Sequence, residues 1–189
     1  MIKLSARERA SSDLAEEWIT EWLTEAPVRR QCLAILAGSI EHARRSAPER
    51  WGVTLCPKGQ EAVRLTIGMI YVCDLSRDRI ALTLHGPSQA AAVLAPYLRG
   101  DNLADLQWCA GGGRAPRPNA PEFPSAPEAV WCWFLARDIG AVWPLVRESY
   151  IRMIELAAKK PLNPVVRRSH SPGVVEYLGA IFPGNLPAL

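Results

Sequence analysis

The sequence lacks the long apolar run that a membrane-spanning helix needs. Such a helix requires roughly 20 consecutive, mostly apolar residues, and no segment of the 189 residues contains one. The first residues, Met1 to Arg9, lead directly into charged sequence without the apolar stretch of a signal peptide. We therefore expect a cytoplasmic protein with no membrane partner.

Cysteine motifs are missing as well. The five cysteines are odd in number and widely separated, none belongs to a Cys-x-x-Cys pair, and none has a histidine at the spacing of a zinc site. We expect neither a disulfide framework nor a metal or other cofactor, and we expect buried, reduced thiols. The cysteines are Cys32, Cys56, Cys73, Cys109 and Cys132.

No catalytic motif can be identified. His85 and His170 could each act as a general base, and Ser88 or Ser169 as a nucleophile, but the sequence offers no third residue to orient the base. The glycine run at 110–114 matches neither Gly-x-Gly-x-x-Gly nor a Walker motif. Whether the protein is an enzyme stays uncertain, and the sequence favours a protein that is not one.

The composition is that of a folded domain. Residues of the apolar class make up 49% of the chain and tryptophan occurs seven times, which is enough apolar surface to offset the entropy cost of ordering the chain. The length suits one domain. We divide it into a helical pair at 1–48, a sheet with helices at 49–160, and a tail with a short helix at 161–189.

Two helices are predicted in the first part. Leu14, Trp18 and Trp22 recur at helical spacing within 13–24. Pro27 suits the first turn of a second helix, whose apolar face is formed by Val28, Cys32, Ile35, Leu36 and Ile40. Arg44 and Arg45 fall at its carboxyl end, where cations complement the helix dipole.

Four strands are predicted next, because the apolar period changes to two. Apolar residues alternate with other residues at 51–55, 63–67 and 80–84, and an apolar run continues from Met69 to Cys73. Gly68 marks a bulge or a bend between two of these segments. Short polar connections favour an antiparallel meander.

The remaining elements are less regular. A helix is expected at 89–99, followed by a glycine- and proline-rich surface loop at 110–127. The apolar run at 129–135 indicates a buried strand, although a helix starting from Ser125 to Glu128 is an alternative. After Asp138 a helix is expected, with Pro144 in its first turn, and a short final helix is expected from Pro172.

The clearest functional indication is electrostatic, although the net charge is only +3. The first group of cations lies in the second helix and its exit and comprises Arg29, Arg30, Arg44, Arg45 and Arg50. The second group lies near the end of the chain and comprises Lys159, Lys160, Arg167, Arg168 and His170, and two further arginines lie in the 110–127 loop. If the fold gathers them, they could bind the phosphates of DNA or RNA. The alternative is a scatter of solvated charges neutralised by neighbouring acids. The candidate nucleic-acid contacts are Arg44, Arg45, Arg114, Arg117, Arg167, Arg168 and His170.

The segment Arg167-Arg-Ser-His-Ser-Pro-Gly-Val-Val-Glu-Tyr-Leu178 resembles a stretch found in uncharacterised bacterial restriction- and defence-associated proteins. The resemblance implies a module that works beside nucleases or nucleotide-driven machines, and it carries over no catalytic residue.

These observations predict an α+β fold, with a small, mainly antiparallel sheet and helices packed on one face. The favoured function is a non-catalytic nucleic-acid-associating module of a bacterial defence or restriction-like system. One alternative is an interaction or assembly subunit that covers a larger partner, or a second copy, with the Trp18 and Trp22 face of its first helix. The other is a small hydrolase that uses His85 or His170.

Overall fold

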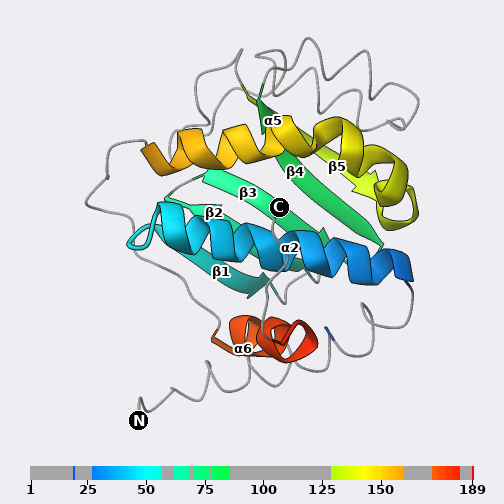
Figure 1. Ribbon diagram of the computed structural model, residues 1–189, viewed down its shortest axis with the longest axis horizontal. Coiled ribbons are helices and arrows are strands. Elements are labelled where there is room, and N and C mark those ends of the chain that lie inside the picture. The colour runs from blue at the N-terminus through cyan, green and yellow to red at the C-terminus, as the bar shows by residue number, and fades with distance from the viewer. Residues whose placement is uncertain are drawn as a thin grey trace.

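The computed structural model describes residues 19, 27–56, 62–68, 70–76, 78–85, 129–159, 172–183 and 189 (Figure 1). These residues form five strands, three α-helices and one short 3-10 helix. In chain order the elements are α2 (Pro27–Ser46), β1 (Trp51–Cys56), β2 (Ala62–Ile67), β3 (Ile70–Ser76), β4 (Arg79–His85), β5 (Ala129–Leu135), η2 (Ala136–Asp138), α5 (Ile139–Lys159) and α6 (Pro172–Ile181).

The five strands form one antiparallel sheet in the order of the chain, β1-β2-β3-β4-β5. The α+β fold and the meander are therefore confirmed. Alternating residues of these strands face the helices, and every one of them whose burial is described is at most 9% exposed. The period of two in the sequence arises because this face of the sheet carries the large apolar side chains, whereas the second face carries smaller or polar residues, of which Ala81 and Thr83 are buried as well.

The connection between β2 and β3 is a tight turn at Gly68. Ile67 pairs with Ile70 across it, and Gly68 has a φ of 62°, a conformation that residues with a Cβ rarely adopt. The prediction of a bend at Gly68 is confirmed.

A bulge lies further along the same strand pair. Thr66 pairs with Tyr71 but Leu65 pairs with Cys73, so β3 contains one extra residue, Val72. The shift places Asp74 opposite Arg64 and turns Cys73 toward the core.

The apolar run at 129–135 is a strand, and the alternative of a helix there is wrong. β5 pairs with β4 along its whole length, from Arg79 opposite Leu135 to His85 opposite Ala129. Cys132 and Phe134 are buried on the helix-facing side. The run shows no alternation in hydropathy, so pairing with β4, which the sequence does not reveal, decides the conformation.

Helices α2 and α5 lie side by side across one face of the sheet (Figure 1). Helix α2 is buried over most of its circumference, because α5, α6 and the sheet all contact it. Its Cys32, Ile35, Leu36 and Ile40 are at most 4% exposed, which confirms the predicted apolar face. The core therefore lies between α2, α5 and the sheet.

The start of α5 differs from the prediction. The helix begins at Ile139, directly after η2, so Pro144 is its sixth residue and not part of its first turn. Burial of Ile139 and Val142 starts the helix early. Proline cannot donate to the carbonyl of Gly140, but Gly140 and Pro144 are both exposed, so water can satisfy that carbonyl.

Helix α6 begins at Pro172, as predicted, and buries Val174 and Leu178 against the core. None of the three described α-helices is both long and apolar enough to span a bilayer. The helices predicted at 13–24 and 89–99 and the loop predicted at 110–127 lie outside the described residues, apart from Ile19, which is helical and buried.

Candidate functional site

The carboxyl ends of α2 and α5 lie at the same end of the molecule. The two helices run in the same direction across the sheet, and both have their carboxyl ends on the left of Figure 1. Arg44 and Arg45 stand in the last turn of α2, and Lys159 stands in the last turn of α5. We call these three residues the cationic end.

Arg50 fixes this arrangement. Its Nη1 donates a hydrogen bond of 3.0 Å to the carbonyl oxygen of Ala158, and its own carbonyl accepts a bond of 2.7 Å from the amide of Gly68. The segment after α2, the β2–β3 turn and the end of α5 are therefore tied together. Arg50 is part-buried and acts as a structural link, whereas the neighbouring Lys159 is exposed.

Arg44 and Arg45 share one carboxylate. Each guanidinium lies 3.7 Å from Glu41, and their side chains are 57% and 66% exposed. Ion pairs at such distances in solvent are weak, and one carboxylate cannot neutralise two guanidiniums. The last turn of α2 keeps a net positive charge, which also complements the carbonyl groups at the end of the helix.

The other predicted contacts cannot be placed. Arg114, Arg117, Arg167, Arg168 and His170 all lie outside the described residues. The structure thus brings Lys159, with which the second group of cations begins, close to the end of the helix that carries Arg44 and Arg45.

The second face of the sheet carries a cluster that sequence reasoning missed. The Arg64 Nε lies 3.0 Å from both carboxylate oxygens of Asp74, and its Nη2 lies 2.6 Å from Oδ2. The same guanidinium lies over the ring of Tyr71, 4.5 Å from the ring centroid. We call Arg64, Asp74 and Tyr71 the arginine–tyrosine stack. The only signal in the sequence was their place at outward positions of two strands.

Burial raises the pKa of the Asp74 carboxyl, although the hydrogen bonds and the charge of Arg64 act in the opposite direction. Desolvation is the larger effect, so the neutral form of Asp74 is easier to reach in the folded protein than in an unfolded chain.

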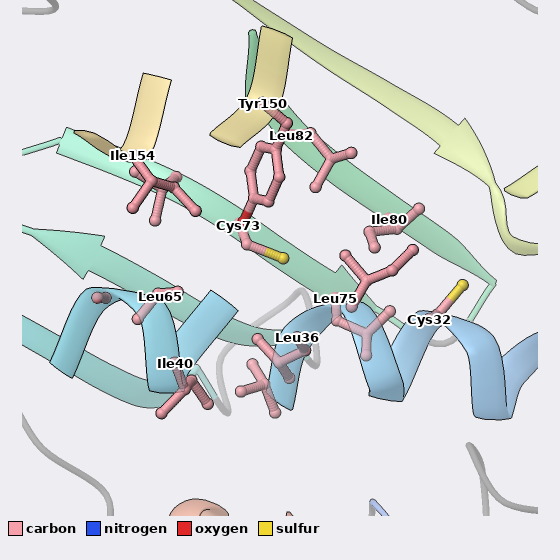
Figure 2. Close-up of a cluster of buried hydrophobic side chains, with 14 of the residues drawn as sticks. Cys32, Leu36, Ile40, Leu65, Cys73, Leu75, Ile80, Leu82, Tyr150 and Ile154 are labelled. Atoms are coloured by element: carbon pink, nitrogen blue, oxygen red, sulfur yellow. The ribbon is translucent and has the colours of Figure 1, made fainter. Parts of the chain in front are cut away.

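Polar groups also occur within the core. The Tyr150 hydroxyl donates a bond of 2.8 Å to Ser39 Oγ, which in turn donates 2.5 Å to the carbonyl of Ile35. Figure 2 shows the Tyr150 ring reaching toward Cys73 between the helices and the sheet. Burial raises the pKa of Cys73 and of Tyr150, and raises that of Cys32 to about 12. These thiols are not activated as nucleophiles.

The described part of the chain shows no arrangement of a nucleophile and a base that would support the hydrolase alternative. The main-chain carbonyl of His85 accepts a hydrogen bond from the Ser149 hydroxyl, which commits that hydroxyl to the backbone. Ser88, Ser169 and His170 lie outside the described residues, as do Trp18 and Trp22 of the assembly alternative. No group of three potential metal ligands forms among the side chains that the structure describes.

Comparisons of this chain with protein-family models, curated proteins and solved structures find no match. The site must therefore be judged on its own chemistry.

Proposed function

We propose that this protein is a non-catalytic nucleic-acid-associating module that contacts phosphates through its cationic end. The observation that carries the proposal is the hydrogen bond from Arg50 to the carbonyl of Ala158, because it holds the carboxyl ends of α2 and α5 together. Arg44, Arg45 and Lys159 are thereby brought to one end of the molecule, where all three are exposed.

Two further features support this proposal. Glu41 pairs with Arg44 and Arg45, each at 3.7 Å. These exposed ion pairs are weak, so a phosphate can displace the carboxylate from both guanidiniums. Residues 160–171, which carry Arg167, Arg168 and His170, follow Lys159 directly in the chain. We expect them, with Arg114 and Arg117, to add contacts, and the resemblance of the 167–178 segment suggests a bacterial defence or restriction-like system as the setting.

The test measures binding of the protein to labelled single-stranded and duplex DNA and RNA over a salt series, from about 50 to about 200 mM. Affinity falls with salt, and each lost phosphate contact reduces the steepness of the plot of log affinity against log salt by about one. The double variant Arg44→Ala/Arg45→Ala should therefore bind more weakly, with a slope lower by about two.

A matched control lies at the opposite end of the sheet. Arg79 and Arg137 are 50% and 67% exposed, and each has a neighbouring acid, Asp78 at 3.8 Å and Asp138 at 4.0 Å. The variant Arg79→Ala/Arg137→Ala removes the same charge from equally exposed positions and should leave the salt slope unchanged. A wild-type protein that binds no nucleic acid, or an equal loss in both variants, overturns the proposal.

A further inference from the structure

The carboxyl end of α2 leaves main-chain carbonyl groups without a donor. The last turn of any helix has carbonyls that find no partner within the helix. The carbonyl of Ala43 accepts a bond of 2.8 Å from the amide of Ala47. No donor among the described residues bonds to the carbonyls of Arg44, Arg45 and Ser46. These three residues are exposed, so their carbonyl oxygens can accept hydrogen bonds from a ligand.

Pro48 explains why α2 ends without pairing these carbonyls. In a continuing helix the carbonyl of Arg44 would accept a bond from the amide of residue 48, but proline has no amide hydrogen and disfavours a helical conformation in the residue before it. The amides of Arg50 and Trp51 are both bonded to the carbonyl of Ala47, at 2.9 and 3.2 Å. The end of α2 therefore combines two exposed cations with acceptors that water or a ligand can use.

This combination suits a ligand that carries an anion and a hydrogen-bond donor side by side. The sugar–phosphate backbone of DNA offers phosphates but no donor. In RNA the 2′-hydroxyl stands on the ribose carbon next to the one that carries the 3′ phosphate, and it is the group by which a protein can tell RNA from DNA. A phosphate held by Arg44 or Arg45 would therefore bring a donor to the carbonyls of the same helical turn.

We propose that the carboxyl end of α2 is a ribose-phosphate site, so that the cationic end binds RNA in preference to DNA. The guanidiniums of Arg44 and Arg45 hold phosphates, and the carbonyls of residues 44–46 accept hydrogen bonds from 2′-hydroxyls. This inference rests on the proposed function, because it names the class of nucleic acid that the cationic end binds.

The test compares strands of one sequence that differ only at the 2′ position: RNA, 2′-fluoro RNA and DNA. The fluoro strand keeps the phosphates and the sugar conformation of RNA but has no 2′-hydroxyl to donate. Single-stranded and duplex RNA both expose 2′-hydroxyls, so the comparison uses whichever form the wild-type protein binds more tightly. The wild type should bind RNA about two- to tenfold more tightly than either of the other strands, as expected for one hydrogen bond.

Two double variants locate the preference for RNA. Arg44→Ala/Arg45→Ala should weaken the binding of all three strands and reduce the preference, because phosphates no longer hold the ribose beside the carbonyls. Arg79→Ala/Arg137→Ala, at the opposite end of the sheet, should change neither the affinity nor the preference.

A pair of proline variants separates the carbonyls from the charges. Pro48→Ala supplies an amide donor for the carbonyl of Arg44 and allows α2 to continue, so it should reduce the preference for RNA and leave the salt slope unchanged. Pro144→Ala supplies the same kind of donor to the exposed Gly140 within α5 and should keep the preference. Circular dichroism measures the gain in helix, and thermal unfolding establishes that each variant is folded.

The outcomes separate the two proposals. Equal, salt-dependent binding of RNA, 2′-fluoro RNA and DNA by the wild type overturns the ribose-phosphate site but leaves the phosphate contacts standing. An unchanged preference for RNA in folded Arg44→Ala/Arg45→Ala, or in folded Pro48→Ala that has gained helix, also overturns this site. A protein that binds none of the strands overturns both proposals.

Discussion

The two faces of the sheet differ in what their side chains do. Leu65, facing the helices, is fully buried, whereas its neighbour Thr66 is half-buried on the second face and donates a long hydrogen bond of 3.3 Å to the carbonyl of Gly52. The helix-facing side is a continuous apolar surface. The second face carries a paired arginine, an aspartate and a tyrosine.

This difference separates stability from recognition. Apolar burial between the helices and the sheet provides most of the free energy of folding, and it leaves no room for a ligand among close-packed side chains. The second face has fewer large apolar side chains, although Ala62, Ala81 and Thr83 on it are buried as well. Changes on the two faces should therefore affect different measurements, and each prediction below tests this division.

The largest effect is expected from adjacent residues on opposite faces of β2. Leu65→Ala removes a fully buried side chain and should lower the free energy of unfolding by about 2 to 5 kcal/mol. Thr66→Ala should lower it by less than about 1 kcal/mol. Urea unfolding of both variants measures the difference. Equal losses would mean that the second face is as much a part of the core as the first.

The next effect concerns the polar groups within the core. Ser39→Ala removes the oxygen acceptor of the buried Tyr150 hydroxyl, leaves it only the weak sulfur partner Cys73, and should cost about 1 to 3 kcal/mol. In Tyr150→Phe, Ser39 keeps its bond to the carbonyl of Ile35, and the cost should be only about 0.5 to 1.5 kcal/mol. Urea unfolding compares them. The reverse order would show that the hydroxyl of Tyr150 finds another acceptor in the core.

These comparisons depend on a sheet that was largely predictable from the sequence. Alternation at 63–67 and 80–84 revealed strands because the large apolar side chains lie on one face of the sheet. The run at 129–135 did not alternate, so a strand was favoured there but a helix stayed an alternative until its pairing with β4 was known. Pro144 was misplaced because buried residues before it begin the helix earlier than proline preference suggests.

The candidate site was predictable only in part. The helix-end positions of Arg44, Arg45 and Lys159 followed from the periodicity, but their proximity depends on the parallel course of α2 and α5. The contact between Arg64 and Asp74 could not be predicted, because it depends on the register between β2 and β3. Counting back from the pair Ile67 and Ile70 would place Cys73 opposite Arg64. The extra residue at the bulge places Asp74 opposite Arg64 instead. No sequence pattern predicted the bulge at this position.

A smaller effect on the second face should depend on pH. Because the pKa of Asp74 is raised in the folded protein, the folded state binds a proton more readily than the unfolded chain. The contribution of Asp74 to stability is therefore greatest below the unfolded pKa and is lost as pH rises through the folded pKa. From about pH 7 down to about pH 4, the wild type should gain stability relative to Asp74→Asn.

Urea unfolding midpoints of the two proteins across this range give the sign directly. If Arg64 outweighed burial, the pKa would be lowered and the wild type would lose stability relative to Asp74→Asn on acidification. The sign therefore tells whether the pair on the second face is governed by desolvation or by charge pairing. Arg79→Ala, which acts at an exposed position, should leave the pH dependence unchanged.

The smallest effect on stability is expected at the cationic end. Arg44→Ala/Arg45→Ala removes two exposed charges that interact with the end of α2 and with Glu41, and should cost at most about 1 kcal/mol. The same variant should show the largest change in nucleic-acid affinity. A loss of several kcal/mol in urea unfolding would assign these arginines to the fold and would remove the reason to treat them as a binding surface.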